Sequence, residues 1–220
     1  MLMYLPFFWE EIKKENTMEK ESKRKPRILC LHGYRESAKI LKKLIFRWPE
    51  SVTGKLDLVF LDAPFPAKGK SRIEGYFDPP YFEWFQFNKA AILCAAIPGM
   101  QREGVALTKV PKIKFVILIS GAKFGGPSFG VPKLAVNAFS YPINCPSLHF
   151  LGEKDYQKKD GEVLLECFVD PQVIHHPKGH AIPELDDSSG EIILGFIEKT
   201  FQKNLGTRAH QYNRKPRAKF

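Results

Sequence analysis

The chain has 220 residues, of which 44% are hydrophobic, and its formal net charge is +10. This length and composition are typical of one globular domain with a sizeable core, and they exclude a wholly disordered chain. No apolar run approaches the roughly 20 residues that a membrane-crossing helix requires, so we expect no membrane span.

The distribution of charge and the cysteines narrow the class of protein further. Basic residues crowd the stretches 20–27 and 205–220, and the second stretch contains no acidic residue. We expect no nucleic-acid partner, because no stacking aromatics, zinc pattern or helix-turn-helix pattern accompanies this charge. The four cysteines show no CxxC or metal-ligand spacing, which favours reduced thiols in a cytoplasmic protein, with the nucleus as a second location.

The first residues form an apolar run, Met1–Trp9, and two glutamates follow it. A signal peptide instead carries its positive charge before the apolar run, so we interpret this stretch as an extension. The compact pattern begins just after Met18, which makes Met18 a candidate for the ancestral start. The predicted parts are a loose extension (1–24), one domain (25–203) and a basic disordered tail (204–220).

Apolar patterns predict alternating strands and helices along the first half of the domain. Arg27–Leu31 is a short apolar run ending in a His-Gly pair, which is typical of a buried strand that enters a tight turn. Ser37 is a candidate N-cap for a helix that continues through Phe46. The run Leu56–Leu61 is the next predicted strand.

The stretch Pro64–Asn88 is a long loop rich in proline and aromatic residues. Loops of this length usually line a site or bind a partner, and the alternative is a loop that packs over the core. Phe77, Tyr81 and Trp84 are its candidate pocket residues.

The second half of the domain continues the alternation of strands and helices. Ala90–Ile97 is predicted as a small-residue helix that Pro98 and Gly99 end. Ser188 or Ser189 is the candidate cap of the last helix. Between them we expect strands at Lys114–Ile119, Ser147–Leu151 and within Pro171–His176, and a helix at Gly161–Cys167.

This alternation predicts an α/β fold, a mostly parallel sheet with helices on both faces. In such sheets the chemistry lies at the carboxyl ends of the strands. Four polar residues fall at predicted strand ends, namely His32, Ser120, Asp155 and His180.

Asp155 and His180 fit the acid and the base of a hydrolytic site. The chain order in α/β-hydrolases is nucleophile, acid, histidine, and these two residues follow the last two predicted strands. The imidazole would act as general base and the carboxylate would fix its tautomer. Alternatively, Asp155 caps a turn and His180 is a surface loop residue.

The backbone after the first strand, at Gly33 and Tyr34, is a candidate oxyanion-hole donor. The alternative is an ordinary tight turn.

Several segments, taken in chain order, resemble the FSH-type serine hydrolases, which are small esterases of fungi and plants with an animal relative. The likeness is greatest to the plant members. It implies an α/β-hydrolase-like fold, no cofactor and hydrolysis of a small acyl ester or thioester. It also implies that Asp155 and His180 are catalytic. The matching segments are Leu29–Arg35, Leu58–Pro64, Trp84–Phe85, Phe150–Asp155 and His176–His180.

One part of that family pattern is missing. The family places a helix, a strand and a GxSxG nucleophile elbow between the aromatic loop and the small-residue helix, whereas here Lys89 runs directly into Ala90. A strand-plus-helix unit amounts to roughly 30 residues. We therefore expect that the central nucleophile strand is deleted.

No other serine takes the place of the nucleophile convincingly. Ser128 lies in Gly126–Gly130, which satisfies GxSxG as letters, but a Gly- and Pro-rich loop surrounds it instead of a strand and a helix. Ser120 ends a strand, but no helix signal follows it. His175, His176 and His180 make a poor metal site, because neighbouring residues of a strand point to opposite faces.

The sequence therefore predicts a serine-hydrolase family protein, carboxylesterase-like by resemblance, that is inactive for want of its serine. Two alternatives stay open. One is a non-catalytic pseudo-hydrolase that binds an acyl ligand, and the other is a basic-tailed interaction protein.

Overall fold

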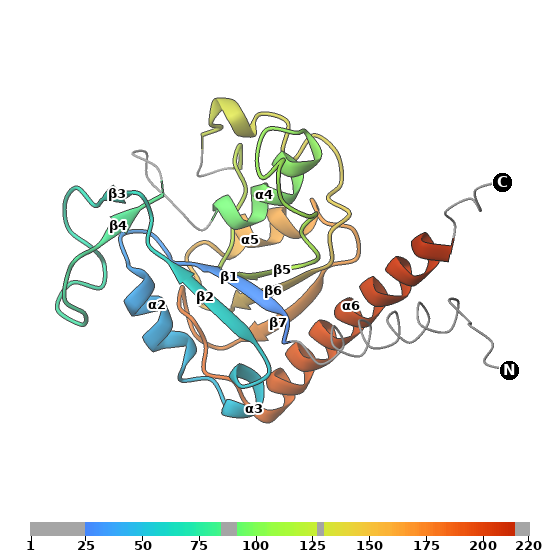
Figure 1. Cartoon of the computed structure of the whole chain (residues 1–220). Helices are drawn as coiled ribbons and strands as arrows, with labels where there is room; N and C mark the ends of the chain where they lie inside the picture. The colour runs from blue at the N-terminus through green and yellow to red at the C-terminus, as the bar shows by residue number, and fades with distance from the viewer. Residues whose placement is uncertain (1–24, 85–91, 127–129, 214–220) are drawn as a thin grey trace, which may run out of the picture.

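A computed structural model of the protein describes residues 25–84, 92–126 and 130–213. Its centre is formed by parallel strands with helices on both faces, which confirms the predicted fold class (Figure 1). The predicted extension 1–24 lies outside the described residues, as does the end of the predicted tail, 214–220.

The first half of the chain forms a pair of parallel strands covered by short helices. Strands β1 and β2 pair in register over their full length. Ser37 caps α2 by accepting a hydrogen bond from Ile40 N, as predicted, and Asp62 Oδ1 accepts from Ala38 N at 2.7 Å. The elements are β1 (Arg27–Leu31), α2 (Ala38–Ile45), α3 (Glu50–Thr53), β2 (Asp57–Leu61), β3 (Phe65–Pro66) and β4 (Phe82–Glu83).

The second half forms a three-stranded parallel sheet in the order β5-β6-β7. Helices α4 and α5 lie on one side of the sheets, while α2, α3 and α6 lie on the other (Figure 1). The elements are α4 (Ile92–Arg102), β5 (Val116–Ile119), the 3-10 turn η1 (Lys133–Ala135), β6 (Ser147–Gly152), α5 (Lys158–Leu165), β7 (Gln172–His176) and α6 (Asp187–Asn213).

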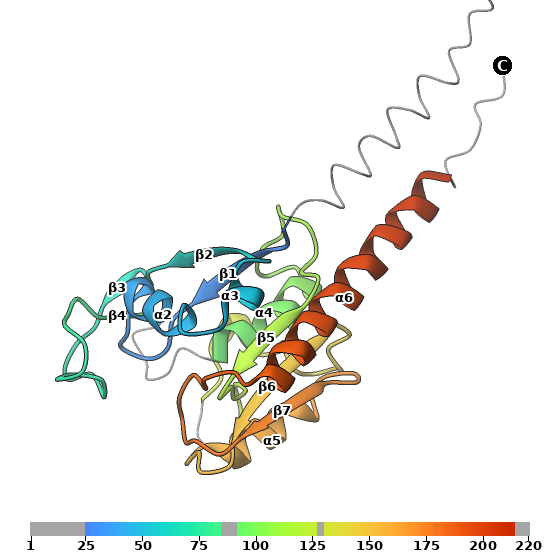
Figure 2. The ribbon, with the colours of Figure 1, turned by 90° about the horizontal axis from the view of Figure 1, so that it is seen from below.

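The parallel strands fall into two separate groups. In the part of the chain that the structure describes, β1 pairs only with β2, and β5 pairs only with β6. Figure 2 shows β1 and β2 on one side and β5, β6 and β7 on the other. The strands β1 and β5 are therefore not hydrogen-bonded to each other.

One apolar core nevertheless joins the two groups of strands. It lies between the strands and the helices α2, α3 and α6. Side chains of both groups contribute to it, so the two groups of strands belong to one domain. Its buried members are Leu41, Ile45, Trp48, Val52 and Leu56 from the first half, Leu148, Phe150 and Ile174 from β6 and β7, and Ile193, Phe196 and Ile197 from α6.

Several predicted helix ends were wrong. Helix α4 does not end at Pro98 but runs through it to Arg102. Helix α5 begins at Lys158, earlier than predicted, and Asp155 Oδ1 accepts a hydrogen bond from the N-cap residue Gln157, through its backbone N, at 2.8 Å.

Helix α6 differs from the prediction at both of its ends. It begins at Asp187, and Asp186, rather than Ser188 or Ser189, caps it by accepting from Ser189 N at 2.8 Å. The helix continues to Asn213, so residues 204–213 are helical where the sequence predicts a tail.

Candidate active site

Asp155 and His180 meet where the adjoining strands β6 and β7 end. His180 Nδ1 lies 3.1 Å from each carboxylate oxygen of Asp155. The Asp155 side chain is only 3% exposed, whereas that of His180 is 32% exposed. A buried carboxylate beneath a half-open imidazole is the arrangement that fixes an imidazole tautomer and leaves its other nitrogen toward the surface.

Backbone contacts hold the two loops that carry this pair. Glu153 N donates to His176 O at 2.9 Å, and Lys154 N donates to Lys178 O at 3.2 Å. A Cβ at Gly152 would come within 2.6 Å of the carbonyl oxygens of Lys178 and Gly179. Glycine at 152 therefore allows the histidine loop to approach close to the end of β6.

A tyrosine and an arginine extend the Asp155–His180 pair outward. The Tyr156 ring lies 4.9 Å from the imidazole of His180, centroid to centroid. Arg72, from the aromatic loop, lies over the same tyrosine ring and donates a hydrogen bond to its hydroxyl. The sequence reasoning missed both residues. Tyr156 had a signal, because it directly follows Asp155, but Arg72 is brought there only by the fold.

Ser120 and Ser128 are the two serines that the sequence offered in place of a nucleophile. Among the side chains of residues 25–84, 92–126 and 130–201, no oxygen forms a hydrogen bond with Nε2 of His180. Ser120 is buried at the tip of β5 with φ 50°, and its Oγ has no hydrogen-bond partner among the atoms described. Ser128 lies outside the described residues.

The candidate oxyanion donor at Gly33 is already engaged. Gly33 N donates to Glu36 Oε2 at 3.1 Å. Burial raises the pKa of the Glu36 carboxyl, and the hydrogen bond from Gly33 opposes that rise. Tyr34 packs beside Arg35, whose guanidinium carbon lies 4.7 Å from the tyrosine ring centroid. The oxyanion role of this backbone stays a prediction.

His32 joins three loops and takes no part in the pair. Its Nε2 accepts from Ala63 N at 3.0 Å, and its Nδ1 lies 2.9 Å from Gly33 O. Trp84 packs on the imidazole and donates from Nε1 to His32 O at 2.9 Å. Burial lowers the pKa of His32. Both ring nitrogens are thus used in neutral hydrogen bonds that hold the loop after β1.

The aromatic loop is tied to the end of β1 by an ion pair. Arg35 Nε lies 2.6 Å from Glu83 Oε1, and both side chains are largely buried. Of the three candidate pocket residues, Trp84 packs on His32, while Tyr81 donates from its hydroxyl to the carbonyl of Phe77. Their role in lining a substrate pocket stays a prediction.

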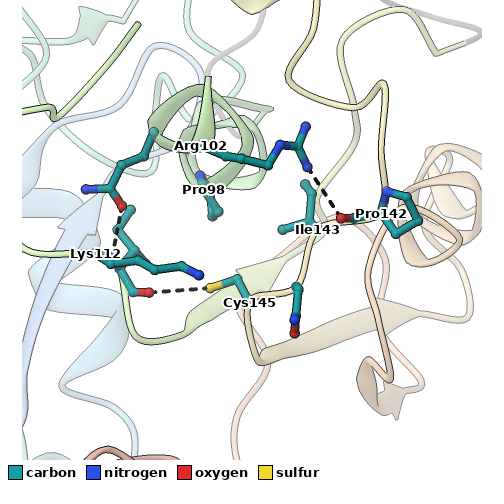
Figure 3. A pocket seen from close by; sticks show the side chains of 9 residues that line it. Pro98, Arg102, Lys112, Pro142, Ile143 and Cys145 are labelled. Carbon is teal, nitrogen blue, oxygen red and sulfur yellow. Dashed lines mark hydrogen bonds between the residues drawn. The ribbon is translucent and has the colours of Figure 1, made fainter. Parts of the chain in front are cut away.

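A cavity of about 80 Å³ lies away from these residues (Figure 3). Its walls include Arg102 at the end of α4. They also include Lys112 and Ile113, which precede β5, and Cys145, which precedes β6, so the cavity lies at the amino ends of these strands. Arg102 donates to the carbonyls of the wall, among them Pro142 O at 3.4 Å, and burial raises the pKa of Cys145 to about 11. The Arg102 guanidinium is thus engaged by the wall itself, and the Cys145 thiol stays protonated and unreactive.

Two further properties bear on the kind of site. Across the described ranges, no three His, Cys, Asp or Glu side chains come together in a way that could hold a metal ion. No helix in the described part of the chain is long and apolar enough to cross a bilayer.

The parallel strands, the helices on both faces and the aspartate–histidine pair at adjoining strand ends define an α/β-hydrolase-like fold. The model of the family described as "Serine hydrolase (FSH1)" matches residues 18–91 and 87–192. The chain belongs to this family.

The chain is also similar to two insect esterases and to one solved structure. An esterase of Anopheles gambiae is 24% identical over 223 residues, covering 82% of this chain and 80% of the mosquito protein. An esterase of Aedes aegypti is 27% identical over 227 residues, and the match covers 86% of this chain and 80% of the Aedes protein. A solved structure, described as the crystal structure of esterase PE8, is 18% identical at a TM-score of 0.44, covering 80% of this chain and 93% of its own.

Proposed function

We propose that this chain is an esterase-family protein that has lost its nucleophile and does not hydrolyse esters at an enzyme's rate. The observation that carries the proposal is the Asp155–His180 pair, whose Nε2 bonds to no hydroxyl in the described part of the chain. In serine hydrolases this nitrogen removes the proton of the attacking serine. Without that serine, the pair has no group to activate.

The strand arrangement supports the loss of a nucleophile strand. In α/β-hydrolases the nucleophile sits on a turn between a central strand and a helix. Within the ranges described here, β1 and β5 each lack a hydrogen-bonded neighbour on one side. One deleted strand between them would account for both open edges.

The comparisons support the same reading. The family model matches in two segments that meet at residues 87–91, where the sequence predicts the deletion. The alignment with the Anopheles esterase extends over 223 residues yet covers only 82% of this chain of 220. Such an alignment requires residues in the relative that have no counterpart here.

What remains is a pseudo-hydrolase whose ligand is a small acyl ester or thioester, bound without turnover. Removing a triad member leaves about 10³–10⁴-fold catalysis over water, from binding and the remaining groups. Typical enzymes accelerate their reactions by about 10⁶-fold or more.

A fluorophosphonate probe, which phosphonylates activated serines, tests the proposal on the full chain. We expect no stoichiometric labelling, and we expect hydrolysis of 4-nitrophenyl acetate to be the same in His180→Ala and in the wild type. His175→Ala is the matched control, because His175 is an exposed histidine of β7. Labelling that maps to Ser120 or Ser128, and that His180→Ala abolishes while His175→Ala does not, would overturn the proposal.

A further inference from the structure

One face of the β1–β2 pair exposes apolar side chains. Ile28, Cys30, Leu58 and Phe60 point toward the shared core. Side chains alternate along a strand, so the residues between them lie on the opposite face. That face, which we call the open face, consists of Leu29, Leu31, Val59 and Leu61.

The open face is only partly covered. Leu29 is 50% exposed and Leu61 is 45% exposed, although both belong to strands of a parallel sheet. Parallel sheets are normally buried on both faces. Here α2 packs against β1 and β2 on the core side, and α4 packs against β5.

Among the described strands, none pairs with the edge of β1 that faces away from β2. Asp57 N donates to Pro26 O at 3.0 Å, which sets the pairing of the two strands. In a parallel ladder with this pairing, the backbone groups of Ile28 and Cys30 face β2, and those of Leu29 face away from it. An apolar face beside unpaired backbone groups favours docking of an extended apolar peptide.

The chain itself carries such a peptide. Residues 1–9 read MLMYLPFFW, a run without a charged residue. The family match begins at residue 18, so this run is additional to the family domain. The fifteen residues 10–24 that connect it to the domain can span up to ~50 Å when extended, whereas β1 is a strand of five residues. A tether of this length gives about millimolar effective concentration, so that even weak contacts suffice.

We propose that Met1–Trp9 folds back onto the open face and covers Leu29 and Leu61. This role rests on the proposed function, in which the deleted strand and helix would otherwise lie beside β1. The interaction is intramolecular, and it leaves the shared core on the other side of β1 and β2 unchanged.

Thiol labelling of the full chain tests this. A Leu61→Cys reporter is treated with a maleimide, with and without the paired substitutions Leu5→Asp and Phe8→Asp in the apolar run. We expect the charged substitutions to raise the labelling rate by about tenfold. A segment bound roughly nine-tenths of the time leaves position 61 accessible in about one-tenth of the molecules, and the substitutions release it in all of them. Leu134→Cys is the matched control, since Leu134 is 67% exposed in η1, and its labelling rate should stay the same.

The native cysteines also react with the maleimide. Their labelling is measured separately, in the chain without a reporter cysteine. Labelling at position 61 that the charged substitutions leave unchanged would overturn the proposal. Protection that rises with protein concentration would also overturn it, because a second copy would then cover the face. Protection that is independent of concentration and is lost with the charged substitutions would support it.

Discussion

His149 is a buried histidine that the candidate site does not use. It lies in β6 with 2% of its surface exposed, and its Nε2 is 2.9 Å from Ser147 Oγ. The Phe168 ring packs edge-on against the imidazole, at 5.1 Å between centroids. Burial penalises the charged imidazolium and lowers the pKa of His149 from 6.5 to about 4. The folded state therefore favours the neutral imidazole of His149.

This pKa shift predicts a loss of stability in acid. Because the folded-state pKa lies below the unfolded one, the contribution of His149 is complete above pH 6.5 and is lost as the pH falls toward 4. The shift corresponds to about 3 kcal/mol. In urea unfolding from pH 7 to pH 4, the wild type should lose about 3 kcal/mol more than His149→Asn, whose side chain does not titrate. Parallel pH curves for the two proteins would contradict this.

The residues of the candidate site differ in how far the sequence could predict them. Asp155 and His180 follow strands in the chain order typical of α/β-hydrolases, and the structure brings their side chains together. Glu36 was not foreseen, because its contact with Gly33 N depends on a side-chain rotamer and on the shape of the loop after β1. Arg72 is 84 residues from Tyr156 in the chain, and no local pattern relates the two.

At the scale of elements, strands were predicted more accurately than helix ends. The apolar runs located β1, β2, β5, β6 and β7 to within two residues, because alternation and length are local properties. The end of α4 was misplaced, because Pro98 and Gly99 usually stop a helix. Tertiary packing against Ala135 and Ala138 carries α4 past them.

The glycine in α4 is required by close packing and not by backbone conformation. A Cβ at Gly99 would come within 1.9 Å of Ala138 O, whereas a Cβ at Gly195 in α6 would meet nothing within 4 Å. Gly99→Ala should destabilise the protein by about 1–3 kcal/mol despite the better helix propensity of alanine. Gly195→Ala, its matched control, should stabilise by about 0.5–1 kcal/mol. Thermal unfolding measures both changes, and a shift of the same sign in the two variants would contradict the packing argument.

At the scale of the whole molecule, two sheets that share no hydrogen-bonded strands in the described chain depend on one core. Trp48, between α2 and α3, is one residue that connects the two halves. Its ring stacks on Phe150 of β6 at 5.9 Å, and its Nε1 donates to Pro183 O at 2.9 Å. The sequence could not predict this link, because residues 48 and 183 are 135 positions apart.

Trp48→Ala should therefore weaken both sheets together. Truncation of a buried aromatic side chain costs about 3–5 kcal/mol. Trp48→Phe keeps an aromatic ring on Phe150 but leaves the Pro183 carbonyl without its donor, and should cost about 1–3 kcal/mol. Hydrogen exchange of backbone amides reports on each half separately. If the shared core makes the domain one cooperative unit, the exchange rates of amides in β2 and in β6 rise by similar factors in each variant. Acceleration confined to β1 and β2 would mean that β5, β6 and β7 fold as an independent unit, and that the domain tolerates its divided sheet because each part is stable alone.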